Sequence, residues 1–438
     1  MKKIFVVSFI SVGYFLNAQS LSNSPYATYG IGDVKYDNTI ETASMGGIST
    51  AFISDFTSSF NFANPANNAN FELTSIRLEA TNENNYFKSN YNDMKSTKHS
   101  TYLSNISIAF PLSSKVKMGI SYQPYSSKSY DIVTEQFASD NTTPLYKNNF
   151  KGSGTLNTAQ LAVSYKINQE LSVGAKANLY FGDLNDLNEF RAYNSNLGTY
   201  VGEYVNGYET KNRVRNFNFT LGTSYQTLNT RTDKKFTVGA TATFGNTSNM
   251  TTQYTNSTYR YSDAQETTKV SGSETIIEQK ETKSKNLLPL QASVGVGYGS
   301  ENHWFVSGQV DYKKGEDISY FGKSFSFQDT YRISAGGWYL PNYNNFRSYF
   351  SRVIYRYGAF YERGNLNLEG NSINKFGISA GVMLPFKNSS ITRMSGLEIG
   401  LEVGKRGTLQ NNLINQNFVN LRIGFNFADK WFRKTLYN

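Results

Sequence analysis

The sequence predicts an all-β fold, and within that class a transmembrane antiparallel β-barrel of about fourteen strands. Apolar residues occupy every second position along most of the chain, which gives each segment one face for lipid and one for a polar lumen. The gaps between these segments are alternately short and long, as in outer-membrane barrels. The mean hydropathy of −0.48 argues against a bundle of transmembrane helices.

Residues 1–18 have the features of a secretory signal peptide. Lys2 and Lys3 precede an apolar run, residues 4–16, and Ala18 supplies a small residue for cleavage. The run is too short to cross a bilayer as a helix, because about 20 residues are needed. Export together with the barrel pattern predicts a location in the outer membrane of a Gram-negative bacterium.

The remaining chain divides into three parts. Residues 19–70 are rich in Asn, Ser, Gly and Ala and do not alternate, so we expect a compact segment ahead of the barrel. Alternation then continues without a linker, so residues 71–432 are assigned to one barrel domain. Residues 433–438 contain Arg433 and Lys434 and are predicted to form a cationic tail at the periplasmic headgroups.

The segment predicted to be the last strand, 415–428, shows the alternation most clearly. Its apolar face consists of Val419, Leu421, Ile423, Phe425 and Phe427, and its polar face of Asn420, Arg422, Gly424 and Asn426. A charge in the middle of a lipid-facing surface costs about 2–4 kcal/mol, which explains a face without charges. The segments at 115–125, 373–385 and 394–405 follow the same pattern.

The gaps between strands set the expected topology. Gaps near residues 112–114, 168–169 and 300–302 are short, whereas those at 82–98, 126–155, 183–209 and 251–279 are long. Because outer-membrane barrels have short periplasmic turns and longer external loops, the long gaps are predicted to be extracellular. This arrangement places both termini in the periplasm and makes the number of strands even.

Pro289 interrupts the segment predicted as a strand over 280–299. Proline has no N–H to donate to the ladder, so a bulge or local break is expected there. A lateral opening of the barrel wall at the same place is the alternative.

Composition argues against an enzyme and against a metal or cofactor site. The chain has no cysteine and only two histidines, and the predicted topology places His99 and His303 at opposite ends of the barrel. The formal net charge of +10 favours contact with anionic outer-membrane lipid or lipopolysaccharide. Nucleic acid is not expected as a partner, because the protein is exported.

Residues 45–52, Met-Gly-Gly-Ile-Ser-Thr-Ala-Phe, and residues 64–67, Asn-Pro-Ala-Asn, resemble motifs of the FadL-type outer-membrane barrels. In that family these motifs belong to a pre-barrel segment that folds into the lumen as a hatch. The two ends of the chain, 23–33 and 417–434, look like a Bacteroidota branch of these barrels, and the chain is also similar to the PorV type. The resemblance implies a barrel of about fourteen strands with residues 19–70 as an N-terminal luminal plug.

The residues that carry the resemblance to the hatch are Met45, Gly46, Gly47, Asn64, Pro65 and Ala66. Pro65 fixes one backbone angle and the two glycines permit unusual ones, which predicts tight turns. The alternative is a gate that moves when a ligand binds.

Charged residues on the lumen face form a second predicted set of contacts, namely Arg77, Glu79, Arg332, Arg352, Arg356, Glu398, Glu402 and Arg422. Their mixed signs predict salt bridges that hold the plug to the wall, where loss of one partner would leave a costly orphan charge. Arg352 and Arg356 are expected to share a face of a strand over 346–361. The alternative is that these two arginines hold the headgroup of an anionic ligand.

Two functions remain open after the comparison with the FadL type. The first is passage of hydrophobic small molecules across the outer membrane, which predicts a continuous apolar cavity between hatch and wall. The second is a non-transporting barrel subunit of an outer-membrane protein secretion or assembly complex, whose long extracellular loops bind envelope partner proteins. The loops at 183–209 and 251–279 are polar and rich in Tyr, which favours protein contact. A plain porin is disfavoured, because a hatch would block an aqueous path.

Overall fold

The computed structural model describes residues 24–430, except for positions 36–37, 55, 57–58, 91–92, 139–142, 195–198, 201–203, 230, 263–267, 322, 346 and 388–393. The predicted signal peptide, 1–18, and the predicted tail, 433–438, lie outside the described residues. Among the described residues, no helix has the length and apolar character needed to span a membrane.

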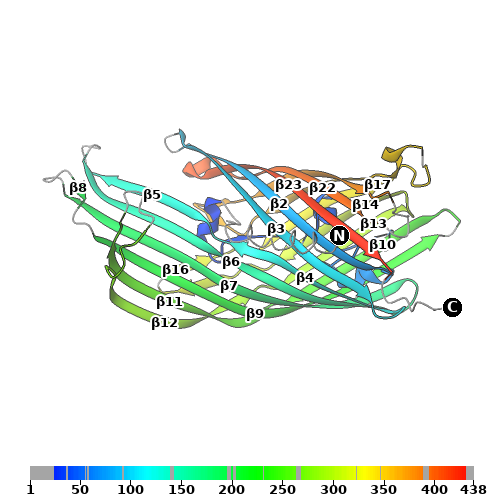
Figure 1. Cartoon of the computed structure of the whole chain (residues 1–438), viewed down its shortest axis with the longest axis horizontal. Helices are drawn as coiled ribbons and strands as arrows, with labels where there is room; N and C mark the ends of the chain where they lie inside the picture. Colours follow the sequence, from blue (N-terminus) through cyan, green and yellow to red (C-terminus); the bar gives the residue numbers. More distant parts are fainter. Residues whose placement is uncertain are drawn as a thin grey trace, which may run out of the picture.

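Fourteen antiparallel strands close into a barrel, which confirms the fold class predicted from the sequence (Figure 1). Each barrel strand pairs with the next along the chain, and the last returns to the first from Thr74↔Asp429 to Ser89↔Ile414. The barrel strands are β2 (Thr74–Ser89), β3 (Lys95–Pro111), β4 (Val116–Ser127), β6 (Pro144–Lys166), β7 (Leu171–Asn194), β9 (Tyr204–Asn229), β10 (Lys234–Phe244), β13 (Gln291–Ser300), β14 (Trp304–Lys313), β17 (Thr330–Tyr339), β18 (Ile354–Arg363), β21 (Lys375–Pro385), β22 (Gly396–Gly407) and β23 (Ile414–Asp429).

Alternation along these strands separates an apolar exterior from a polar lumen. On β21, Ile378 is 67% exposed whereas its neighbour Ser379 is buried. On β9, Phe219 is half exposed whereas Asn218 and Thr220 are buried. Large apolar side chains that avoid water therefore cover the outside of the wall, as the exterior of a membrane barrel requires.

The two ends of the barrel differ. At one, here called the short-turn end, brief connections join β6 to β7 and β13 to β14. At the other, the long-strand end, β6, β7 and β9 extend far beyond the barrel (Figure 1). Together with β5 (Tyr130–Phe137), β11 (Asn246–Arg260) and β12 (Thr275–Leu288) they form an extended sheet of order β5-β6-β7-β9-β11-β12. β8 (Thr199–Tyr200) pairs with the tip of β7.

The strand predicted over 280–299 is divided at Pro289 into β12 and β13, which confirms the expected break. β10 and β11 are divided at the same level by Gly245, where a Cβ atom would lie 2.5 Å from the carbonyl oxygen of Leu288. The wall continues directly after the break, because Gln291 pairs with Thr243 of β10 and with Lys313 of β14. The described strands therefore leave no gap beside Gln291.

The wall is interrupted elsewhere, between β3 and β4. These strands pair only from Pro111↔Lys117 to Ile106↔Tyr122, although β3 continues to Lys95. Near the end of this pairing lies Pro124, which has no N–H to donate, and the register of β4 with β6 shifts just after it. We refer to this separation as the β3–β4 seam.

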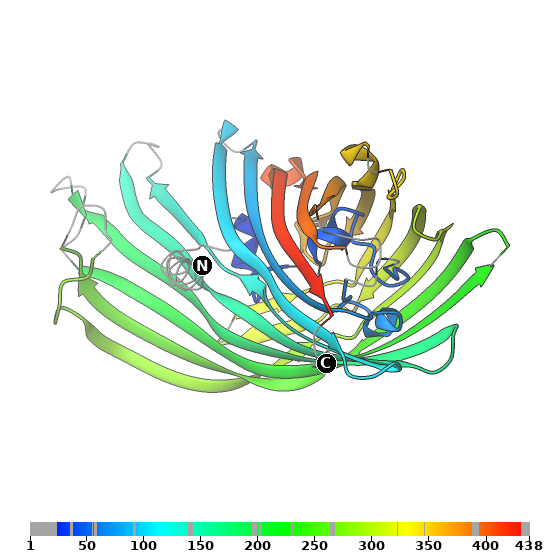
Figure 2. The same cartoon turned by 45° about the vertical axis from the view of Figure 1, so that its right-hand side comes forward.

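The N-terminal segment lies inside the barrel and contacts its inner wall (Figure 2). It contains η2 (Pro25–Thr28), β1 (Asp33–Val34), α2 (Ile40–Ala43) and η3 (Pro65–Asn68). Tyr26 donates its hydroxyl to the carbonyl oxygen of Ile414 at the long-strand end. Ser172, at the short-turn end, donates to the carbonyl oxygen of Ala66 at 2.8 Å. The segment, hereafter the plug, therefore runs through the lumen from one end to the other.

A second element folds inward between β14 and β17. It is a hairpin of β15 (Asp317–Tyr320) and β16 (Lys323–Ser326). Ile318 of this hairpin is buried in an apolar cluster with Leu156, Leu184, Val214 and Met250. The sequence pattern did not predict this hairpin. The remaining short elements are η5 (Tyr349–Arg352), β19 (Asn367–Leu368), β20 (Asn371–Ser372) and η6 (Gln410–Asn412).

Candidate functional site

Asn64 organises the short-turn end of the plug. Its side-chain oxygen accepts a hydrogen bond from the N–H of Ala66 at 3.1 Å and so caps η3. Its Nδ2 donates to the carbonyl oxygens of Thr50 at 2.7 Å and of Thr223, in β9, at 3.2 Å. Because Asn64 is fully buried, these bonds are shielded from water and join two parts of the plug to the wall.

Glycines allow the plug backbone to approach the wall closely. A Cβ atom on Gly174 of β7 would lie 2.6 Å from the carbonyl carbon of Pro65. Gly46 has a φ of +74° and donates its N–H to Ser379 Oγ at 2.9 Å. A Cβ atom on Gly46 would lie 2.7 Å from the carbonyl oxygen of Ala359. The hatch motif is thus fitted to the wall at both of its ends.

The other two hatch residues take different environments. Met45 is fully buried in an apolar cluster that includes Phe52 and Trp338. Gly47 has a φ of +90°, and a Cβ atom there would lie 2.9 Å from Arg332 Nη2. The same nitrogen of Arg332 donates to the carbonyl oxygen of Gly46 at 3.0 Å.

A buried ion cluster joins the plug to three barrel strands. Glu41 of α2 lies 3.1 Å from Arg77 of β2 and 2.9 Å from Arg356 of β18. Glu398 of β22 lies 3.4 Å from Arg77 and 3.8 Å from Arg356. Glu79 completes the group at 3.6 Å from Arg77 and accepts the N–H of Ile40. We call these residues, other than Ile40, the Glu41 cluster.

The Glu41 cluster has almost no contact with water, since each of its side chains is at most 5% exposed. Burial alone would raise the pKa of Glu41, but the guanidinium groups of Arg356 and Arg77 lower that pKa below its usual range. Ser59 also donates its hydroxyl to Glu41. A charged carboxylate is therefore the form that holds the plug, and its loss would leave two arginines with less neutralisation.

Further ion pairs lie in the lumen nearer the long-strand end. Glu402 is 3.1 Å from Arg422 and 3.8 Å from Lys375. Arg332 is 3.5 Å from Glu362. Arg422, Lys375 and Arg332 therefore each have a carboxylate partner within the protein.

β1 closes part of the β3–β4 seam from inside. It pairs antiparallel with β4 at Asp33↔Ser127 and Val34↔Ser126, on the side of β4 that β3 leaves vacant. Asp33 is 2.7 Å from Arg406, and Lys35 is 2.8 Å from a carboxylate oxygen of Glu83. Two ion pairs on different strands thus fix the ends of this short plug strand.

Opposite effects on the pKa of Asp33 and Lys35 favour their charged forms. Burial alone would raise the pKa of Asp33, but Lys35 and Arg406 lower it below its usual range. Burial alone would lower the pKa of Lys35, but Glu83 and further negative groups raise it above its usual range. The seam contacts are therefore ionic over a wide range of pH.

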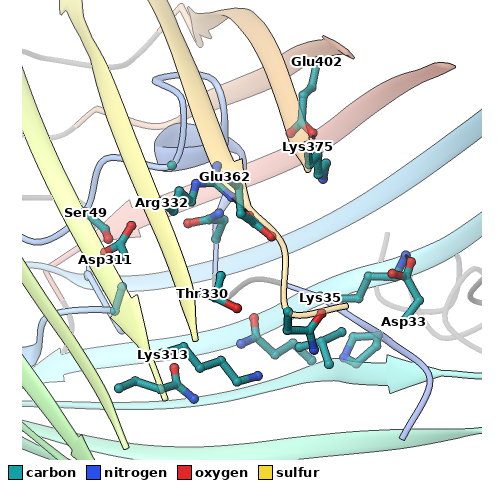
Figure 3. Close-up of a pocket in the computed structure, with 18 of the residues that line it drawn as sticks. Asp33, Lys35, Ser49, Asp311, Lys313, Thr330, Arg332, Glu362, Lys375 and Glu402 are labelled. Carbon is teal, nitrogen blue, oxygen red and sulfur yellow. Dashed lines mark hydrogen bonds and ion pairs between the residues drawn. The ribbon is translucent and has the colours of Figure 1, made fainter. Parts of the chain in front are cut away.

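A cavity of about 330 Å³ remains between plug and wall (Figure 3). Its lining includes the charged residues Asp33, Lys35, Glu83, Lys176, Asp311, Lys313, Arg332, Glu362, Lys375, Glu402, Arg406 and Arg422, and most of the rest are Ser, Thr, Asn and Gln. Figure 3 shows Asp33, Lys35 and Lys375 around this space. A hydrophobic guest would remove water from charged groups without replacing it, which is unfavourable.

Arg352 is the predicted site residue that lies apart from the rest. The strand expected over 346–361 begins only at Ile354, and Arg352 lies in η5. The expectation that Arg352 and Arg356 share a strand face is therefore wrong. Arg352 donates to the hydroxyl of Tyr343 at 3.1 Å, whereas Arg356 lies in the Glu41 cluster.

Several residues of the site were not predicted from the sequence. Glu41, Asp33 and Lys35 lie in a segment without alternation, so no period indicates which side chains face the wall. Glu362 and Lys375 end or begin strands, where strand boundaries are least certain. In the described part of the chain no group of three or more His, Cys, Asp or Glu is placed to hold a metal ion.

A closed fourteen-stranded antiparallel barrel is the fold that this chain shares with FadL-type outer-membrane channels. The sequence model of the BamG family matches residues 1–438, and the chain therefore belongs to the BamG family. A comparison with curated protein sequences finds no match.

Solved structures share this fold at low sequence identity. The chain is similar to the Pseudomonas putida toluene transporter TodX, with a TM-score of 0.56, 14% identity and coverage of 91% of this chain and 99% of that one. It is similar to the CymD monoaromatic hydrocarbon channel, with a TM-score of 0.54, 14% identity and coverage of 90% and 97%. A Pseudomonas aeruginosa FadL homologue matches with a TM-score of 0.57, 11% identity and coverage of 91% and 98%. At these sequence identities the similarity establishes a shared fold and no more.

Proposed function

We propose that this protein is a non-transporting barrel subunit of an outer-membrane protein assembly complex and that it binds partner proteins at its long-strand end. The observation that carries the proposal is the ionic filling of the lumen. A transporter of hydrophobic molecules needs an apolar path, whereas the cavity here is lined by five acidic residues, seven basic residues and many uncharged polar ones. The family name, BamG, is also distinct from those of the hydrocarbon channels.

The plug supports this proposal because it is held as a fixed part of the barrel. The Glu41 cluster anchors the middle of the plug, and Asn64 anchors the part at the short-turn end. Asp33 and Lys35 anchor β1 at the β3–β4 seam. In this proposal Met45, Gly46, Gly47, Asn64, Pro65 and Ala66 form permanent turns and do not act as a gate. Arg356 neutralises Glu41 and does not hold the headgroup of a ligand.

The extended sheet supplies the proposed contact surface. Its strands extend past the rest of the barrel wall on one side only, so that a large β-surface projects from the long-strand end (Figure 2). In this proposal the long-strand end faces the outside of the cell and the short-turn end faces the periplasm. Tyr259, at the far end of β11, and Tyr261, just beyond it, both donate their hydroxyls to Glu189 of β7, and in this proposal these bonds stiffen the surface for binding.

The second candidate function is passage of hydrophobic small molecules. The fold of TodX and CymD favours it, since both are named as transporters or channels for aromatic hydrocarbons. The apolar cluster around Ile318 also lies inside the long-strand end. A path from this cluster past the Glu41 cluster to the periplasm would, however, require the plug to move.

The two functions are separated by purification from the native outer membrane in mild detergent, followed by mass spectrometry and by toluene-uptake measurements on the parent and deletion strains. The proposal expects partner proteins at fixed stoichiometry and equal toluene uptake in both strains. Recovery of a lone barrel, together with reduced uptake in the deletion strain, would support the transport function and overturn the proposal.

A further inference from the structure

A short helical turn at the short-turn end exposes two aromatic side chains. Phe350 of η5 is 72% exposed, more than any other large apolar side chain of the described residues, and its neighbour Tyr349 is 46% exposed. η5 lies in the connection between β17 and β18, past the end of β17 (Figure 1). Two adjacent aromatic rings in water are unfavourable, which indicates a further surface that covers them.

Two tyrosine hydroxyls fix this turn to the ends of two barrel strands. Tyr355 of β18 donates its hydroxyl to the carbonyl oxygen of Phe350 at 3.2 Å. Tyr349 donates its hydroxyl to the carbonyl oxygen of Pro385, the last residue of β21, at 3.1 Å. Because its neighbour Ile354 is buried in the apolar cluster inside the barrel, Tyr355 lies on the outer face of the wall. A side chain of the lipid-facing surface therefore holds the backbone of Phe350.

The wall next to η5 carries a row of aromatic side chains. Tyr355 pairs with Tyr339 of β17, and Tyr339 pairs with Trp304 of β14, so that these three residues lie side by side across the wall. The ammonium group of Lys234 lies 4.8 Å from the centre of the Trp304 ring. A row of Tyr and Trp is typical of the boundary between the lipid chains and the headgroups. η5 therefore lies beside the level of the headgroups.

The chemistry on the other side of η5 also fits lipid. Past the end of β21, the ring of Phe386 contacts that of Phe427, which is 52% exposed on β23, with centroids 5.8 Å apart. Arg347, three residues before Phe350, is exposed and forms no ion pair with the residues that the structure describes. Exposed rings next to a cation match lipid chains next to phosphate groups.

We propose that η5 is a membrane-docking turn, which inserts into the lipid leaflet at the short-turn end of the barrel. Phe350 and Tyr349 enter the lipid next to the headgroups, and Arg347 binds the phosphate group of an anionic phospholipid. The occupant is lipid and not a protein, because the lipid that covers the wall at Tyr355 continues over the turn that Tyr355 holds. In the proposed orientation this is the periplasmic leaflet. The contact lies at the opposite end from the proposed partner surface and does not depend on the proposed function.

Single cysteines in the full-length protein test the surroundings of Phe350, since the chain has no cysteine of its own. Phe350→Cys, Ile378→Cys and Ile277→Cys are each labelled with the fluorophore NBD in vesicles of phosphatidylethanolamine and phosphatidylglycerol. Ile378 is 67% exposed on the wall, and Ile277 is 59% exposed on the extended sheet.

Nitroxide groups on the lipid are expected to quench the label at positions 350 and 378. Iodide in the water is expected to quench the label at position 277 severalfold more strongly than at position 350. Iodide quenching at position 350 as strong as at position 277, without quenching by nitroxide lipid, would leave the ring free for a protein partner and overturn the proposal. Because the purified barrel is measured without other proteins, this failure is distinct from a failure of the proposed function.

Two further substitutions test the contacts of the turn in the labelled Phe350→Cys protein. Tyr355→Phe removes the hydroxyl that holds the turn, so iodide quenching should rise and quenching by nitroxide lipid should fall. Tyr357→Phe, on the same outer face and 49% exposed, is the matched control and should change neither. Arg347→Ala should remove the stronger quenching by anionic than by neutral nitroxide lipid. Heat-dependent gel mobility confirms that each barrel is folded. If none of these substitutions changes the quenching and iodide reaches position 350, the membrane-docking turn is overturned.

Discussion

The two halves of the barrel hold the chain in opposite ways. At the short-turn half, plug and wall share buried charges, close glycine contacts and the hydrogen bonds of Asn64. At the long-strand half, strands run past the barrel and end in two edges, β5 and β12, each paired on one side among the described strands. One half is a filled core and the other is an exposed β-surface.

Under the proposed function, this difference explains how the same fold would exchange a transport path for a binding surface. A lumen closed by ion pairs tolerates little motion of the plug, because each buried charge depends on its partner. An edge strand, by contrast, needs no motion to bind, since its backbone groups are already arranged for a further strand. The proposed function would thus need no change in the order of the strands, since one fold can carry more than one function.

The largest effect is expected from Glu41→Ala, which removes the carboxylate shared by Arg77 and Arg356. Leaving buried charges without this partner should destabilise the protein by about 3–5 kcal/mol. Urea unfolding in detergent micelles measures the loss, and proteolysis of the plug shows where it acts. Glu278→Ala, in an exposed pair with Lys280, is the control. Equal stability of Glu41→Ala and wild type would mean that the short-turn half is not held by its ion cluster.

Gly174→Ala tests the close fit of the hatch motif against β7. The new methyl group would meet Pro65 and the N–H of Ala66 at 2.6 Å, so plug or strand must shift. Overpacking of this kind costs about 1–3 kcal/mol. Gly308→Ala is the matched control, because the nearest atom to a Cβ there, the carbonyl oxygen of Ser334, is 4.0 Å away. If both alanines are tolerated alike, the plug is less tightly seated than the distances indicate.

The sequence predicts side-chain directions where apolar and polar residues alternate, that is, along the barrel strands. Alternation on β23 places Arg422 inward, and the same reasoning places Arg77, Arg356 and Glu398 on the lumen face of their strands. The missing member, Glu41, lies in the aperiodic plug, where side-chain direction depends on tertiary contacts alone. Arg352 was misplaced for a related reason, because the predicted strand begins at residue 346, eight residues before the true start of β18 at Ile354, and so includes Arg352.

The β3–β4 seam and the inward hairpin β15–β16 could not be predicted from the pattern of each strand taken alone. Pro289 signals a break because it lies within an alternating run, and the structure has that break. Pro124 is at the margin of its run, and its effect on the partner strand β3 depends on register between strands, which one sequence does not contain. The hairpin β15–β16 packs on residues more than sixty positions away, so no local pattern indicates it.

A smaller effect concerns the seam, where the two halves meet. Asp33→Asn should cost about 1 kcal/mol at neutral pH, because Arg406 loses a charged hydrogen-bond partner. The pKa of Asp33 is lowered in the folded protein, so its contribution is complete above the ordinary aspartate value near ~3.9 and fades only as the pH falls below it. Unfolding curves of wild type and Asp33→Asn should therefore differ by a constant amount from neutrality down to about pH 4 and converge below it. A difference that already shrinks between about pH 6 and 5 would contradict the ionic seam.

The smallest effect is expected from Arg213→Ala on the extended sheet. Arg213 is 3.2 Å from Asp183, but the two side chains are 59% and 44% exposed, so water screens the pair. Exposed pairs contribute about 0–1 kcal/mol, and salt weakens them further. The urea midpoint of Arg213→Ala should match that of the wild type in high salt, whereas the loss caused by Glu41→Ala should persist there. A large, salt-resistant loss at Arg213 would show that the exposed half is held by ions as the filled half is, and would remove the distinction between them.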